Sequence, residues 1–169
     1  MNAPRLIVTA ALFAFGLSCM AADEKSDELK VLDRYIGTWD GQITMTAPEQ
    51  KTSTESNTTT WAIGGKYLQV KSTTKLDDTE AMHLVTYDQQ KQTYRYYWFN
   101  SAGLTFTSNG TWDEAKKTFT WDGQIEDGVT LKMTDHFLDD KTRDMHVTVK
   151  DGNGDTVFEV TVKFTKRKA

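Results

Sequence analysis

From Thr38 to Lys166 apolar and polar residues alternate with a period of two, and short turn signals interrupt the alternation at even spacing. This pattern is typical of half-buried antiparallel strands joined by tight turns. The two prolines are Pro4 and Pro48, so none of these segments is broken by proline. The pattern predicts ten strands, over residues 38–46, 53–62, 66–74, 80–87, 93–100, 103–112, 117–125, 129–138, 142–150 and 156–166.

The arrangement of these strands follows from their edges. Ten consecutive strands in an open sheet would leave two long unpaired edges, and closure into a barrel removes them. Before the first strand, Ser26 is a candidate N-cap, Leu29, Leu32 and Ile36 recur at helical spacing, and Gly37 is suited to end a helix. The sequence therefore predicts an all-β fold, an antiparallel up-and-down barrel of about ten strands with a short N-terminal helix.

Trial hairpins identify the face that points inward. A two-residue turn at Asn153-Gly154 and short loops in the preceding hairpins align apolar residues across successive strands. Asp135 falls on the same face, opposite Val147 on one side and Trp121 on the other. The predicted pairs are Phe158–Val149, Val160–Val147, Val162–Met145, Phe137–Met145, Met133–Val149, Ile125–Leu131, Phe119–Phe137, Trp112–Phe119 and Gly110–Trp121.

The segment 93–100 is aromatic on both faces, so its orientation depends on the loops beside it. Loops at 88–93 and 100–103 pair Leu84 with Tyr97, Tyr97 with Phe106, and Arg95 with Ser108, which places Arg95 inside. The opposite face would then be an outer patch that either contacts a partner or a membrane or is covered by the N-terminal helix or a loop. Its members are His83, Val85, Tyr87, Tyr94, Tyr96 and Trp98.

A few polar residues on the inner face suggest a ligand cavity. An inward Arg95 could clamp a ligand carboxylate through two hydrogen bonds. Buried charges are costly unless they are paired, so Arg95 and Asp135 could instead pair with each other, or Asp135 could accept a hydrogen bond from the Trp121 indole. The predicted ligand-binding residues are Arg95, Tyr97, Phe106, Trp121, Met133 and Asp135.

The N-terminus has the features of a secretory signal peptide over residues 1–21. Arg5 precedes an apolar run at 6–17, and Ala21 is a small residue suited to cleavage. This run is too short to span a membrane. Cys19, the single cysteine, could alternatively be the lipid-bearing residue of a lipoprotein. Residues 22–169 then form one exported barrel domain, located in the periplasm or secreted.

Composition and motifs exclude several functions. The chain has 20 Lys+Arg against 24 Asp+Glu, without a basic stripe, so nucleic acid is not an expected partner. None of the common hydrolase, P-loop, zinc-protease or dinucleotide motifs occurs. His136 and His146 form a predicted outward pair without a third ligand, and "DGNGD" at 151–155 continues with Thr156 where a calcium loop needs Gly. We expect no catalytic residue, no metal site and no cofactor.

"LDRYIGTWDG" followed by a strand meander resembles the lipocalin-like (calycin) barrels, with Gly37-Thr38-Trp39 matching their Gly-x-Trp. This resemblance implies that Trp39 closes the barrel floor against a basic residue of the last strand, Lys166 or Arg167, through a cation–π contact. Residues 29–168 resemble, more narrowly, the bacterial domain of unknown function 1579 family, through "IGGKYL", "VTYDQQKQTYRYYWFNSAG", "NGTWD" and "FEVTVKFTKRK". That family implies a barrel and no established catalytic residues. A relative, the nitrobindin-type barrel, holds haem through a histidine, but His146 is predicted to point outward.

The string "TWDGQI" occurs twice, at 38–43 and 120–125, with unrelated flanks. In each copy Trp, Gly and Ile share one face, and we interpret each glycine as a strand bend or bulge that curves the barrel.

Two functions remain open. The first is non-covalent binding of a small apolar or amphipathic ligand in the barrel. The alternative is a cell-envelope interaction module with a filled barrel, which would contact a protein partner through the outer Tyr/Trp patch. A barrel hydrolase or isomerase would rest on analogy of fold alone.

Overall fold

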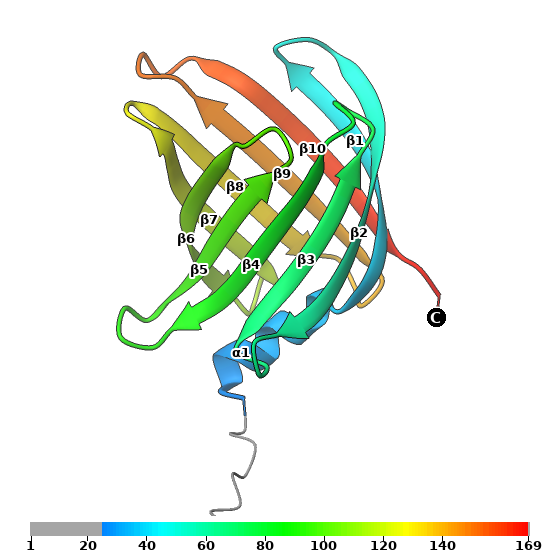
Figure 1. The fold of residues 1–169 in the computed structure, drawn as a ribbon, viewed down its shortest axis with the longest axis vertical. Helices are drawn as coiled ribbons and strands as arrows, with labels where there is room; N and C mark the ends of the chain where they lie inside the picture. Colours follow the sequence, from blue (N-terminus) through cyan, green and yellow to red (C-terminus); the bar gives the residue numbers. More distant parts are fainter. Residues whose placement is uncertain (1–24, 169) are drawn as a thin grey trace, which may run out of the picture.

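A computed structural model describes residues 25–168, which form a closed antiparallel barrel of ten strands preceded by one short helix (Figure 1). The predicted fold is confirmed. The predicted signal peptide, with Cys19, lies outside the described residues. The elements are α1 (Asp27–Val31), a 3-10 turn η1 (Leu32–Tyr35), β1 (Gly37–Ala47), β2 (Lys51–Ala62), β3 (Tyr67–Thr74), β4 (Glu80–Asp88), β5 (Thr93–Asn100), β6 (Thr105–Asp113), β7 (Thr118–Glu126), β8 (Val129–Phe137), β9 (Thr142–Lys150) and β10 (Thr156–Lys166).

Each strand pairs with its neighbours in sequence, and β1 closes the barrel by pairing with β10. The described sheet therefore has no open edge. Within the described residues, no helix is long and apolar enough to cross a membrane.

The N-terminal helix closes one end of the barrel, at the start of β1 (Figure 1). Leu32 is completely buried there. The Tyr94 hydroxyl donates a hydrogen bond of 3.0 Å to the backbone oxygen of Glu28, and the Trp39 indole donates one of 2.8 Å to the backbone oxygen of Tyr35. These contacts attach the helix to β5 and β1 and make it the floor of the barrel.

Several predicted hairpin registers are confirmed. On the β9–β10 side Phe158 pairs with Val149, and between β6 and β7 Gly110 pairs with Trp121. Two neighbouring registers differ by two residues from the prediction. Phe137 pairs with Arg143 instead of Met145, and Leu131 pairs with Gly123 instead of Ile125.

The difference between β8 and β9 comes from a tighter turn. The Asp139 carboxylate accepts 2.7 Å hydrogen bonds from the backbone of Lys141 and Thr142, which holds the connection short. A shift of two residues keeps every side chain on its predicted face. It also extends the inner face by one position, to Arg143.

The predicted β5–β6 register is wrong by one residue. Tyr97 pairs with Thr107 instead of Phe106, and Tyr96 pairs with Ser108. The Asn100 carboxamide accepts hydrogen bonds from the backbone of Ala102 and Leu104, so the connection is longer than the predicted loop. A slip of one residue exchanges the two faces of a strand. The even-numbered aromatic residues of β5 therefore point inward.

The glycines of the repeated "TWDGQI" have a different role from the predicted one. The register runs without a shift through Gly41 in β1 and through Gly123 in its pairing with β6. A Cβ at Gly41 would lie 2.8 Å from the Phe164 ring, and one at Gly123 would lie 2.8 Å from the Thr107 carbonyl. Close packing, rather than a bulge at the glycine, therefore requires these residues. A shift after Gln124 leaves Ile125 37% exposed, against the prediction that it faces inward.

Candidate ligand site

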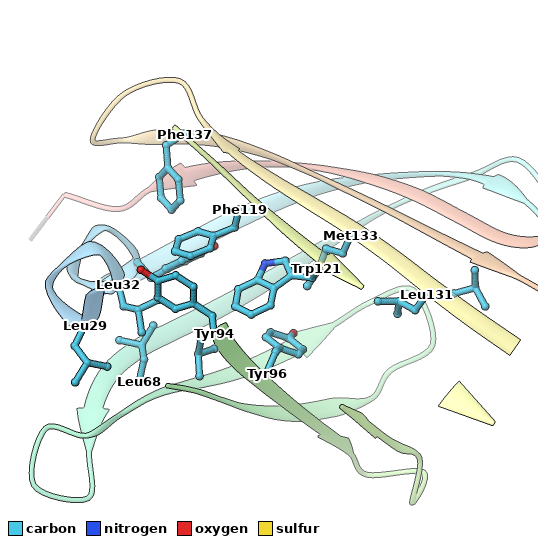
Figure 2. Packing of buried hydrophobic residues seen from close by; sticks show 13 residues of the cluster. Leu29, Leu32, Leu68, Tyr94, Tyr96, Phe119, Trp121, Leu131, Met133 and Phe137 are labelled. Carbon is cyan, nitrogen blue, oxygen red and sulfur yellow. The ribbon is translucent and has the colours of Figure 1, made fainter. Parts of the chain in front are cut away.

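The barrel interior is tightly filled next to the floor and less so at the other end. Beside the helix, Leu32 and Phe119 are completely buried, and Trp121 packs beyond them (Figure 2). Trp98 and Phe106 lie near the strand ends opposite the helix, and both are only partly buried although they face inward. Their rings stack at 5.0 Å. These two rings form an apolar wall that is accessible from the end opposite the helix.

Five inward polar residues, one from each of β2 to β6, form a row that we call the polar belt. Its members are Asn57, Ser72, His83, Tyr96 and Ser108. The Tyr96 hydroxyl lies 2.7 Å from His83 Nδ1, and the Ser72 hydroxyl lies 3.4 Å from His83 Nε2. Asn57 pairs across strands with Ser72, and Tyr96 pairs with Ser108. The belt is therefore a nearly continuous chain of hydrogen-bonding groups around half of the barrel.

Both ends of the polar belt carry polar atoms without a partner. Asn57 and Ser108 are each 3% exposed. Asn57 donates a 3.3 Å hydrogen bond from Nδ2 to Glu55 Oε1. Among the described residues, Asn57 Oδ1 and Ser108 Oγ have no hydrogen-bond partner. Buried polar groups in native proteins are nearly always satisfied, so these two atoms are candidates for contact with a ligand.

A pocket of about 730 Å³ adjoins one end of the belt. It extends along β2 to β5 as far as Glu80 and Asn100, at the strand ends opposite the helix. The belt members Asn57 and Ser72 line it together with Ala81, and these three form one cross-strand row. Their side chains are short, and short inward side chains leave space inside a barrel.

The polar belt is uncharged near neutral pH. Desolvation lowers the pKa of His83 to about 3, and the nearby positive charge of Arg143 also lowers it, so the imidazole is neutral. Burial raises the pKa of the Tyr96 hydroxyl well above its usual range, and the Glu55 carboxylate raises it further. Desolvation also raises the pKa of Glu55, and the hydrogen bond from Asn57 partly opposes this shift.

A buried ion pair lies nearer the floor. Arg143 Nη1 is 2.6 Å from Asp135 Oδ2, and both side chains are 5% exposed. The guanidinium also lies over the Phe164 ring at 3.8 Å and over Tyr35 and Trp39 at 5.1 Å. Asp135 is thus buried as predicted, but its partner is Arg143 and not Arg95 or the Trp121 indole. The alternation of β9 could have identified Arg143. Met145, Val147 and Val149 face inward at every second position, and Arg143 is the next residue in that series.

The predicted ligand-binding residues separate into two groups. Arg95 and Tyr97 lie on the outer face, where Arg95 donates a 2.7 Å hydrogen bond to Asn109, so their predicted inward position is wrong. The other four lie on the inner face. Of these, Phe106 borders the accessible end, whereas the remaining three are at most 5% exposed and pack in the core: Trp121, Met133 and Asp135.

The predicted outer patch is also wrong, because its members point inward. Tyr94 and Tyr96 are at most 9% exposed, and Val85 is 3% exposed. The Tyr96 and Trp121 ring centroids are 5.3 Å apart, and the His83 imidazole shares a hydrogen bond with the Tyr96 hydroxyl inside the barrel. The described barrel therefore lacks the Tyr/Trp contact surface that the interaction-module alternative requires.

Sequence reasoning missed most of the polar belt. Both faces of β2 carry Ser or Thr, and Glu55 and Asn57 lie on the inner face, so the strand has no hydrophobic alternation that would place Asn57 inside. The prediction places His83 in the outer patch through the same slip that misplaces Arg95. The signal that could have found it is its cross-strand pairing with Trp98, once the facing of β5 is known.

The two residues predicted to accompany Trp39 have different positions. Trp39 is completely buried, and Lys166 pairs with it and holds Nζ 5.3 Å from the centroid of its ring. Arg167 instead forms an ion pair with Asp40, through Nε at 2.8 Å and through Nη2.

The two histidines predicted to pair lie on the outside of the barrel as expected, but they are not cross-strand partners, because the β8–β9 register is shifted by two residues. His146 lies 3.2 Å from Glu159, and His136 pairs across strands with Asp144. Among the described residues, no group of three or more His, Cys, Asp or Glu side chains is placed to hold a metal ion.

Comparisons with known proteins agree with this architecture. The sequence profile of a family described as protein of unknown function (DUF1579) matches residues 24–166. The S-type phycobiliprotein lyase CPES from Guillardia theta superimposes with a TM-score of 0.60 and 11% identity, covering 88% of this chain and 96% of that one. Rv2717c from M. tuberculosis superimposes with a TM-score of 0.65 and 11% identity, covering 85% of this chain and 99% of that one. At this identity both show a shared fold. No curated protein matches the sequence.

Proposed function

This chain belongs to the DUF1579 family of lipocalin-like barrels, and we propose that it binds a small apolar or amphipathic ligand non-covalently in the half of the barrel opposite the helix. One observation carries the proposal. An apolar wall that is only partly buried, Trp98 and Phe106, lies on the same inner face as a polar belt with unpartnered atoms. Ligand pockets combine such apolar surface with a few polar groups that fix orientation.

The arrangement suits binding better than catalysis. Within the described chain, the belt contains no charged nucleophile or acid–base pair at its accessible end, and His83 is held neutral by desolvation. Asp135 and Arg143 form a buried ion pair and neutralise each other in the core. A protein partner on the barrel wall is not favoured, because the aromatic residues of β5 that would form its contact surface point inward.

The test is a titration with N-phenyl-1-naphthylamine, an uncharged apolar dye whose fluorescence rises when it leaves water. We expect saturable binding, and we expect Trp98→Ala to weaken it by about tenfold, since losing one aromatic contact removes roughly 1.4 kcal/mol. Tyr97→Ala is the matched control, because Tyr97 is adjacent in sequence but lies on the outer face. Absence of saturable binding, or an equal effect of both variants, would contradict the proposal.

We further propose that the protein is exported, to the periplasm or outside the cell, with residues 1–21 as a cleaved signal peptide. Arg5 and the apolar run at 6–17 support this proposal. Mass spectrometry of the protein recovered from cell fractions tests it. We expect an N-terminus at Ala22 in the exported fraction. A chain that begins at a lipid-modified Cys19 would indicate a lipoprotein, and an uncleaved cytosolic chain would contradict export.

A further inference from the structure

We infer that the head group of the ligand is an uncharged group that both donates and accepts hydrogen bonds, such as the hydroxyl of a long-chain alcohol. The site thereby discriminates against a carboxylate on the same hydrocarbon chain. This inference rests on the proposed function and concerns the polar end of the same site.

The first step is the set of groups that the polar belt offers. Asn57 Oδ1 accepts hydrogen bonds only, and it is unpartnered within the described chain. It belongs to a side chain that is 97% buried and lines the pocket. At the other end of the belt, the Ser108 hydroxyl is also unpartnered and can donate or accept. A head group that only accepts, such as a carboxylate, would leave Asn57 Oδ1 unsatisfied and would place two acceptors in contact.

The second step is the charge around the belt. His83 is neutral, because desolvation and the Arg143 charge both oppose its protonation. Two cations inside the described barrel are already engaged, because Arg143 is paired with Asp135 and Lys166 lies over Trp39 at the floor. Lys71 also lines the pocket, but its position is exposed on the outer face of β3. Glu55, which accepts from Asn57, adds an acidic group next to the pocket. An anion placed against the belt would be desolvated next to an acid, and no member of the belt carries a positive charge that would offset this cost.

The third step is the adaptability of the belt. Neutral His83 has one donor and one acceptor nitrogen, so the Ser72–His83–Tyr96 chain can be hydrogen-bonded in either direction. A hydroxyl can match either direction, since it is donor and acceptor at once. The hydrocarbon part of the same ligand would lie against Trp98 and Phe106, which are already stacked and partly accessible.

The experiment measures displacement of N-phenyl-1-naphthylamine by 1-dodecanol and by dodecanoate, both below their aggregation limits, at a buffer pH of about 7.5, where dodecanoate is ionised. We expect dodecanol to bind at least about tenfold more tightly than dodecanoate. Asn57→Leu, which is close to isosteric, should reduce that preference to less than about threefold, with each affinity measured relative to the variant's own dye affinity. Thr60→Ala, at an exposed position on the opposite face of the same strand and outside the pocket lining, is the control and should keep the wild-type preference.

Equal or tighter binding of dodecanoate by the wild type would overturn the inference while leaving the proposed function in place, because dye displacement itself demonstrates the site. An unchanged preference in a folded Asn57→Leu would also overturn it, since water would then satisfy that oxygen. If Asn57→Leu does not fold, the comparison is made with Ser108→Ala, which removes the second unpartnered atom. Failure of the wild type to bind the dye at all would remove the inference and the proposed function together.

Discussion

The buried Asp135–Arg143 pair makes the stability of this barrel sensitive to a single uncharged substitution. Asp135→Asn keeps the shape of the side chain and removes its charge, so the Arg143 guanidinium remains in the core without its ion-pair partner. Removing one partner of a buried pair costs about 3–5 kcal/mol. The 3.8 Å contact with the Phe164 ring and a residual hydrogen bond to the new carboxamide offset about 1 kcal/mol. We therefore expect a loss of about 3 kcal/mol.

Urea unfolding followed by tryptophan fluorescence measures this loss. With a slope of about 2 kcal/mol per molar urea, the midpoint should fall by about 1.5 M. Replacing both partners with apolar residues, Asp135→Leu with Arg143→Met, should restore stability close to that of the wild type, because no buried charge is left. A matched surface control is Asp113→Asn, which removes the exposed partner of Lys116 and should leave the midpoint unchanged. A loss below about 1 kcal/mol for Asp135→Asn would refute the reasoning, since it would mean that the pair is hydrated.

Two further predictions concern packing and pH. Gly110→Ala should destabilise the barrel by about 1–3 kcal/mol, because the new Cβ would lie 2.3 Å from the Trp121 ring. Gly152→Ala is the control, because its Cβ would meet nothing closer than 3.9 Å. Equal urea midpoints for the two variants would contradict the prediction. Stability should fall by about 2 kcal/mol between about pH 7 and pH 5, because the unfolded chain protonates His83 near pH 6.5 and the folded chain only near its pKa of about 3. This part of the pH dependence should be absent from His83→Gln, and an identical pH profile for the two proteins would show that His83 is not desolvated.

The sequence was sufficient to predict the barrel because most strands have one clearly apolar face. Val147, Val149, Val160 and Val162 alternate with polar residues, and an alternation of this kind tolerates an error of two residues in a turn without changing any face. The predicted β8–β9 pairing contained such an error, and its inner face was nevertheless correct.

The candidate site was harder to predict because its strands lack that alternation. In β5 the residues Tyr94 to Phe99 are apolar or aromatic on both faces apart from Arg95, so the loop length alone decided the orientation, and the Asn100 side chain lengthens that loop. In β2 both faces are polar, so nothing in the pattern distinguishes Asn57 from Ser56. Sites that combine polar and apolar groups inside a barrel remove the periodicity from which facing is normally inferred.

The pairing of β1 with β10 has a consequence for how the chain is made. The first strand to leave the ribosome is joined to the last, with Trp39 opposite Lys166, so it has no permanent neighbour on that side until almost all of the chain has been synthesised. Until then the growing sheet has a free edge at β1 and another at its newest strand, and such edges pair readily with other chains. A chain that ends before β10 would therefore form a sheet with two unpaired edges rather than a smaller barrel, so the last strand is required to remove both edges at once.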